Sequence, residues 1–162
     1  KILVNGKVRK DLGFALGLMD VISIPSLHEH YRLFYDVKGK FKILALKEEE
    51  SDIRVVQIKD KTIITPGRMQ LNNSDGTNIL LEKNTDYNTG DTLFLSLKDG
   101  KITEHLPLKK GTRIYISGGT KQGVVGILEE TKEKNILVKT PEGNFETAKR
   151  YAFAIGKMRT LE

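Results

Sequence analysis

The sequence predicts an all-β protein built from small, turn-rich domains. Runs of branched and aromatic residues recur at short spacing, and clusters of glycine, proline, asparagine and aspartate separate nearly all of them. No segment keeps the 3.6-residue periodicity of a long amphipathic helix. The 162 residues include 15 glycines, which suit small, twisted barrels. We therefore expect a succession of antiparallel hairpins.

The first third of the chain contains two predicted hairpins. Asn5-Gly6 separates two short strands and favours a type I′ turn, because both central positions of that turn need a positive φ. Residues 37–40 form the second turn, and the acidic stretch 47–52 is expected to form a helical turn or a charged connection. The strands expected here are 2–4, 7–9, 20–24, 31–35 and 41–46.

The middle and the last third continue in the same way. A strand over 53–65 is interrupted near 59–61, and a large turn cluster follows at 72–76. The Pro, Lys and Gly residues of 107–111 mark a boundary between two units. The further strands expected are 69–71, 78–81, 92–97, 101–108, 112–117, 123–129, 135–140, 145–147 and 152–155.

The charge of the chain favours a polyanionic partner. Lysine and arginine number 27 against 21 acidic residues, which gives a formal net charge of +6 at pH 7. The charge is unevenly distributed, since residues 1–47 carry a net +5, residues 48–108 a net −4 and residues 109–162 a net +5. Two basic ends around an acidic middle indicate two places where phosphate groups can lie. Ordinary solvated charge with chance clustering is the alternative interpretation.

Several function classes lack the residues that they need. The chain has no cysteine, which excludes disulfides and thiolate metal sites, and no apolar run of roughly 18 residues, so we expect a cytoplasmic protein. His28 and His30 have no complete ligand set around them, and His105 is isolated. The glycines of 118–126 lack the Gly-Lys-Ser/Thr of a phosphate-binding loop. We therefore expect neither enzyme activity nor a metal or other cofactor.

Basic side chains on the predicted hairpins and loops are the main candidates for a binding surface. Alternation along a strand places Lys38, Lys40 and Lys42 on one face, and Tyr115 and Tyr151 lie near the basic residues of the last third. Cationic groups on loop tips reach RNA phosphates without entering the deep, narrow major groove of A-form RNA. The expected RNA-binding residues are Lys7, Arg9, Lys10, Lys38, Lys40, Lys42, Lys109, Lys110, Arg113, Lys121, Lys149 and Arg150.

Segments spread over nearly the whole chain carry a family resemblance. The matching segments are 5–11, 17–24, 32–36, 39–41, 118–127, 145–147 and 153–156. In order and spacing they resemble the e-type ribosomal protein S-four family, a small-subunit family of archaea and eukaryotes. The run Gly17-Leu18-Met19-Asp20-Val21-Ile22 and the full order of the segments are specific, and 118–127 resembles the KOW motif that the family carries near its C-terminus.

The resemblance implies three units and a chain that is truncated at its N-terminus. Residues 1–11 would be the remnant of an S-four-type RNA-binding module, 12–107 a central β-barrel-like domain, and 108–157 a small SH3-like KOW barrel. Residues 158–162 would be a tail or a cloning remnant. The family's recognition helices would precede Lys1.

The resemblance also implies a function and its partners. The chain would be a structural constituent of the small ribosomal subunit, would bind ribosomal RNA and neighbouring ribosomal proteins, and would use neither a membrane nor a small-molecule substrate. A KOW-bearing transcription or translation factor is the alternative, and it predicts an exposed apolar docking patch and weak salt dependence. An RNA-modifying enzyme is disfavoured, because two small barrels offer no catalytic cleft.

Overall fold

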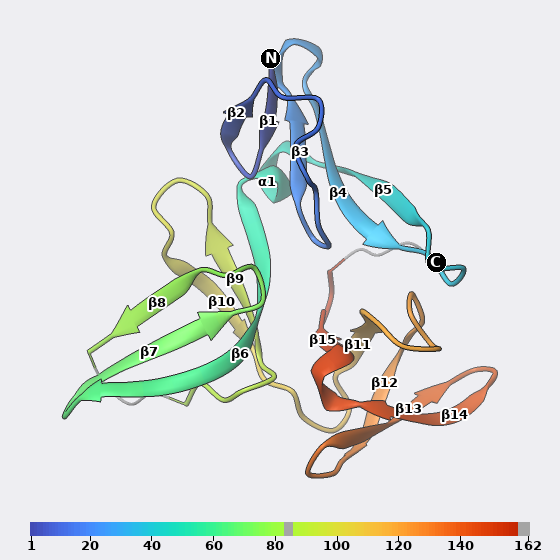
Figure 1. Ribbon diagram of the computed structural model, residues 1–162. Coiled ribbons are helices and arrows are strands. Elements are labelled where there is room, and N and C mark those ends of the chain that lie inside the picture. The colour runs from blue at the N-terminus through green and yellow to red at the C-terminus, as the bar shows by residue number, and fades with distance from the viewer. Residues whose placement is uncertain (83–85, 159–162) are drawn as a thin grey trace.

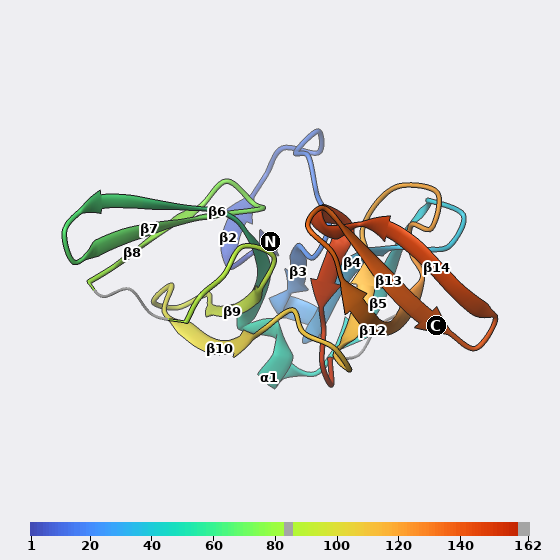
Figure 2. The same ribbon diagram turned by 90° about the horizontal axis from the view of Figure 1, so that it is seen from below.

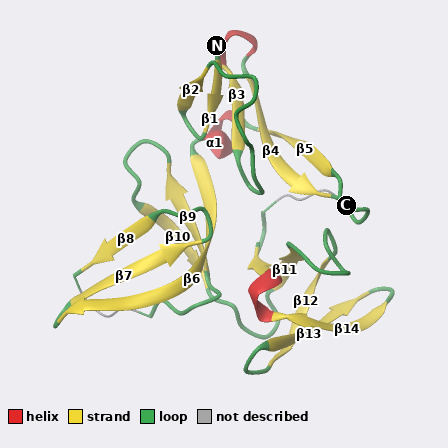
Figure 3. Cartoon of the chain, in the orientation of Figure 1, coloured by secondary structure: helices red, strands yellow, loops and turns green. Residues whose placement is uncertain are grey.

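Three antiparallel sheets of five strands each make up the protein (Figure 1). The computed structural model describes residues 1–82 and 86–158. Within these residues the helical elements are the one-turn helix α1 (Glu48–Ser51) and the 3-10 turns η1 (Pro25–Leu27) and η2 (Lys149–Tyr151), and strands dominate the rest (Figure 3). The prediction of an all-β protein is therefore confirmed.

The first sheet has the strand order β2-β1-β3-β4-β5. Asn5 and Gly6 have φ values of 50° and 80° between β1 and β2, as the predicted type I′ turn requires. The Asn5 side chain also fixes this turn to β3, because it donates to Asp20 Oδ1 and accepts from the backbone N–H of Val21, each at 3.0 Å. The strands are β1 (Ile2–Val4), β2 (Lys7–Arg9), β3 (Val21–Ile24), β4 (Glu29–Tyr35) and β5 (Phe41–Leu46).

The second sheet has the strand order β10-β9-β6-β7-β8 and is built on one long strand. This strand, β6 (Ile53–Thr65), pairs with β9 along its first half and with β7 along its second half. The predicted interruption at 59–61 is wrong, because β6 continues there with a register shift between Ile58 and Asp60. The other strands are β7 (Arg68–Asn73), β8 (Asn78–Leu81), β9 (Thr92–Ser96) and β10 (Ile102–Leu106).

The third sheet has the strand order β14-β13-β12-β11-β15. Its strand β12 begins two residues later than the predicted start at 123, because residues 117–124 form a loop in which Gly119 and Gly123 have positive φ values. The strands are β11 (Arg113–Ile116), β12 (Val125–Thr131), β13 (Asn135–Thr140), β14 (Gly143–Ala148) and β15 (Ala152–Ala154).

A shared core joins the three sheets, which surround it as three lobes (Figure 1 and Figure 2). The second and third sheets each have a further apolar cluster of their own. Removal of apolar surface from water in the shared core favours association of the three sheets. This core consists of Met19, Phe34, Val55, Tyr115, Phe153 and Ile155.

The predicted units divide these sheets unevenly. The unit 1–11 contains β1 and β2, which pair within the first sheet, whereas 12–107 contains strands of two sheets and 108–157 contains the third sheet. The division into units stays a prediction. Of the predicted tail 158–162, residues 159–162 lie outside the described residues. In the described part of the chain, no helix has the length and apolar character to cross a membrane.

Candidate nucleic-acid interface

The tip of the β4–β5 hairpin presents lysine side chains to solvent. Asp36 fixes the turn, because its Oδ1 accepts hydrogen bonds from the backbone N–H groups of Lys40 at 2.8 Å and Lys38 at 2.9 Å. These amide donors, that of Lys40 first, stabilise the carboxylate and hold the pKa of Asp36 below its usual range. Lys38, Lys40 and Lys42 are all exposed.

The loop 117–124 of the third sheet lies against this hairpin tip (Figure 1 and Figure 2). Gly123 approaches the tip so closely that a Cβ atom there would lie 2.7 Å from the backbone nitrogen of Val37. In the same loop Lys121 is exposed, with Nζ 5.4 Å from the ring centroid of Phe145. Exposed lysines far apart in the sequence thus lie on two turns that are in contact, and we call them the hairpin-tip patch, which consists of Lys38, Lys40, Lys42 and Lys121.

Tyr115 joins β11 to the same hairpin from the inside. Its hydroxyl donates to the carbonyl oxygen of Tyr35 at 2.7 Å and accepts from the backbone N–H of Tyr35 at 2.8 Å. Burial raises the pKa of Tyr115 to about 12. The sequence placed Tyr115 among aromatic residues near RNA-binding cations, but it is 1% exposed and belongs to the core.

Tyr151 is half-buried and packs beside the glycines of the same loop. A Cβ atom on Gly118 would lie 2.7 Å from its Cε1 atom, so a glycine is needed for this contact. The guanidinium of Arg150 lies 4.9 Å from the ring centroid of Tyr151, and its Nη2 donates to the Tyr151 hydroxyl at 3.0 Å. Arg150 is therefore held in place while its side chain stays exposed.

A second group of cations lines a groove of about 630 Å³ between the second and third sheets. Lys149 and Arg150 belong to η2, Lys59 to β6, and Lys134 directly precedes β13. Lys59 Nζ lies 3.4 Å from the carbonyl oxygen of Arg150. Partial burial, and after it the nearby Arg150 cation, lower the pKa of Lys59. We call this the β6–η2 groove and its cations are Lys59, Lys134, Lys149 and Arg150.

Sequence reasoning missed two of these four cations. Lys59 lies in the acidic middle of the chain, and Lys134 stands next to Glu133 in a turn, so the local charge pattern indicates neither. Lys59 joins Lys149 and Arg150 because the second sheet lies beside the third, whereas Lys134 meets them within the third sheet, where the backbone N–H of Lys149 donates to the carbonyl oxygen of Lys134 at 2.8 Å. A contact of this kind leaves no local signal in the sequence.

The predicted basic residues of the first hairpin lie apart from both groups. Lys7 and Arg9 are exposed on β2, which forms one edge of the first sheet, and Lys10 follows directly. The Arg9 guanidinium lies 4.4 Å from the ring centroid of Phe14. These three cations are therefore available to a separate stretch of a polyanion.

The predicted residues between β10 and β11 have different environments. Lys109 and Lys110 are exposed in the connection. Arg113, at the start of β11, is half-buried, and its Nη1 donates to the carbonyl oxygen of Met158 at 3.0 Å. Arg113 thus holds the segment that follows β15, whereas its two neighbours project into solvent.

The three histidines do not come together. His30 Nδ1 lies 2.9 Å from Ser23 Oγ, His28 ends η1 with a φ of 53°, and His105 Nε2 lies 2.6 Å from Asp91 Oδ2. Across residues 1–82 and 86–158, no three metal-ligating side chains form a group. The exposed His28 and the paired His30 therefore offer no ligand set to a metal ion.

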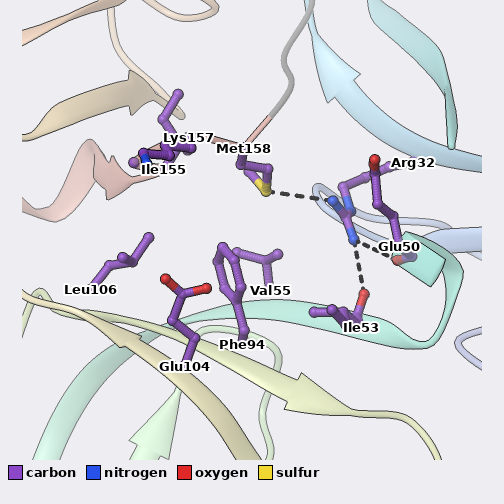
Figure 4. Close-up of a pocket in the computed structure, with 11 residues that line it drawn as sticks. Arg32, Glu50, Ile53, Val55, Phe94, Glu104, Leu106, Ile155, Lys157 and Met158 are labelled. Carbon is purple, nitrogen blue, oxygen red and sulfur yellow. Dashed lines mark hydrogen bonds between the residues drawn. The ribbon is translucent and has the colours of Figure 1, made fainter. Parts of the chain in front are cut away.

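A second cavity, of about 580 Å³, surrounds a buried arginine (Figure 4). Arg32 is 2% exposed, and its Nη2 donates to the carbonyl oxygens of Ile53 at 2.9 Å and Glu50 at 3.3 Å, while Nη1 lies 3.4 Å from Met158 Sδ. Burial lowers the pKa of Arg32 to about 10. These contacts join β4 to α1, β6 and the C-terminal segment. We therefore interpret Arg32 as a structural residue that holds these elements together.

The sequence is similar to ribosomal proteins over almost its full length. A model of the family described as Ribosomal family S4e matches residues 27–102. The small ribosomal subunit protein eS4 of Archaeoglobus fulgidus is 36% identical over 163 residues, which cover 97% of this chain and 68% of that protein. The eS4 protein of Methanocaldococcus jannaschii is 36% identical over 169 residues, which cover 96% of this chain and 68% of that protein.

The fold agrees with the sequence similarity. The crystal structure of the 30S ribosomal protein S4e from Thermoplasma acidophilum matches with a TM-score of 0.81 and 32% identity, covering 96% of this chain and 80% of that chain. The all-β fold, the basic surface and these similarities define a ribosomal protein. Within that class, the chain belongs to the ribosomal family S4e.

Proposed function

We propose that this chain is a structural constituent of the small ribosomal subunit that binds ribosomal RNA through charge and shape. The family relationship carries the proposal, because the eS4 relatives align with 96 to 97% of the chain. The net charge of +6 supports it. The protein supports translation at the cytoplasmic ribosome without any reaction of its own, and its partners are the RNA and neighbouring ribosomal proteins.

The contacts to RNA come from cations on protruding turns. The hairpin-tip patch presents four exposed lysines on two turns, one from the first sheet and one from the third, that contact each other. Each phosphate that such a group neutralises releases condensed counterions, which favours binding at low salt. The turns also suit an RNA helix, whose phosphates and shallow minor groove are accessible while its major groove is not. In this proposal the third sheet is the KOW unit of 108–157.

Charge reversal of the hairpin-tip patch tests the proposal. The triple variant Lys38→Glu, Lys40→Glu and Lys42→Glu should bind a small-subunit RNA fragment more weakly, and its log-log salt slope should be smaller by about 2 to 3 units. Filter binding between low and moderate salt gives both quantities. Co-sedimentation with small ribosomal subunits tests assembly.

A triple variant with the same change in charge serves as the control. It replaces Arg68, Lys98 and Lys101 by Glu, and these three residues are exposed in the acidic middle of the chain. We expect its affinity for the RNA to fall far less. An equal loss in both variants would show that net charge, rather than the hairpin-tip patch, determines binding.

A further inference from the structure

The β6–η2 groove concentrates cations that have no carboxylate partner. In the part of the chain that the structure describes, none of its four cations forms an ion pair, and Glu133 is the single carboxylate that lines the groove. Like charges held around one groove repel each other. A bound anion would remove this repulsion, so the charge arrangement favours a phosphate group.

The size and the walls of the groove suit a ligand larger than phosphate. Its volume of about 630 Å³ lies within the range of roughly 300–1,000 Å³ that is usual for small-molecule sites. Ile58 and Ala148 line it with apolar groups, and the aliphatic part of Lys149 lies beside Gly90, where a Cβ atom would be in ordinary contact, 3.5 Å from Lys149 Cε. Such walls suit the flat surface of a base or a ribose.

Gln57 adds an unsatisfied acceptor to the inner wall. It lines the groove although it is 1% exposed, and its Nε2 donates to the carbonyl oxygen of Ala152 at 2.5 Å. This bond orients the carboxamide and leaves Oε1 without a hydrogen-bond partner in the described structure. A buried acceptor without a partner is costly, and a ligand N–H or O–H group that reached it would remove this cost.

We propose that the β6–η2 groove binds one unstacked nucleotide of RNA. The cations hold its phosphate, the apolar wall takes its base or ribose, and Gln57 Oε1 accepts a hydrogen bond from it. A paired and stacked base could not enter, whereas bulges and single-stranded loops expose bases that proteins bind in this way. The inference rests on the proposed function, which supplies RNA as the partner.

Two RNA duplexes that differ by a single bulged nucleotide test the inference. The wild-type chain should bind the bulged duplex about tenfold more tightly than the fully paired one. The variant Lys59→Gln with Lys149→Gln should lose most of this difference. The control variant Lys101→Gln with Lys139→Gln should keep it, because both residues are exposed and lie outside the groove.

Small ligands distinguish a nucleotide site from a simple anion site. Nucleoside monophosphates should shift the backbone and side-chain amide signals of Gln57 and the amide of Gly90 in NMR titrations, and should bind more tightly than inorganic phosphate. The proposal is overturned by equal binding of the two duplexes, by equal affinity for inorganic phosphate, or by tighter binding of an acidic peptide. The charge-reversal test of the hairpin-tip patch is independent of these outcomes.

Discussion

The hydroxyl of Tyr115 ties the third sheet to the first through two hydrogen bonds to Tyr35. We expect Tyr115→Phe to lower the free energy of unfolding by about 1 to 3 kcal/mol, because two backbone groups of Tyr35 lose their partner. Urea denaturation measures the change. As a control, Tyr31→Phe removes an exposed hydrogen bond to Glu29 and should change the stability by less than about 0.5 kcal/mol.

The raised pKa of Tyr115 gives the same variant a signature in alkaline solution. In the unfolded chain this phenol ionises near its ordinary pKa of 10.0, whereas in the folded protein its pKa is raised to about 12. Between these values the unfolded state binds fewer protons, so the stability falls as the pH rises. Tyr115→Phe should show a smaller fall between pH 10 and 12. An equal fall in stability in the variant and in the wild type would show that groups other than Tyr115 cause the pH dependence.

Single residues differ in how far their role can be predicted from the sequence. Exposed turn lysines such as Lys38 and Lys40 are predictable, because a polar turn after an alternating strand places them in solvent. The sequence offers the same grounds for expecting Tyr115 and Arg113 near RNA as it does for these lysines. Each of the two side chains instead donates a hydrogen bond to a backbone carbonyl group that is distant in the sequence. Their role depends on tertiary contacts that the neighbouring residues do not indicate.

At the scale of elements, the loop 117–124 fits the β4–β5 hairpin only because position 123 has no side chain. Gly123→Ala should destabilise the protein by about 1 to 3 kcal/mol more than Gly111→Ala, because the added Cβ meets the hairpin backbone. Gly111 is a matched control, since its φ of 86° is close to the 88° of Gly123 but nothing lies within 4 Å of an added Cβ. Thermal unfolding of the two variants measures the difference. Equal losses of stability would mean that the loop shifts to make room for the added Cβ atom at no extra cost.

Most strands and hairpins could be predicted, because their signals are local. Asn5-Gly6 specifies the first turn by its φ values alone, and the alternation of 41–46 and 92–97 identifies strands without any knowledge of their partners. The strand β6 was expected to break because its pattern changes near Lys59. The change instead reflects an exchange of partners from β9 to β7, which a sequence pattern cannot separate from an interruption.

Over the whole molecule, the shared core predicts that the three sheets unfold together. Its residues come from all three sheets, so the loss of one sheet would expose apolar surface of the other two. We expect one cooperative thermal transition, with equal midpoints by circular dichroism and by tyrosine fluorescence. Two resolved transitions would show that the separate clusters of the second and third sheets are sufficient to hold them folded.

The grouping of the basic residues is the least predictable property of the molecule. The uneven charge of the sequence indicated two basic ends, but the hairpin-tip patch combines residues from both ends. The β6–η2 groove adds Lys59 from the acidic middle. The composition therefore predicts the kind of partner, whereas the sites follow from the packing of sheets far apart in sequence.

The close contact between Gly123 and the β4–β5 hairpin has a thermodynamic consequence for RNA binding. Two turns that are locked together before the RNA arrives lose little conformational entropy when it binds. The backbone of the two turns holds the Cα atoms of the lysines in the hairpin-tip patch at a fixed spacing, and an RNA whose phosphates lie out of reach of the side chains has to deform. Discrimination among RNA structures can thus arise at this surface from the stiffness of the protein, without a hydrogen bond to any base.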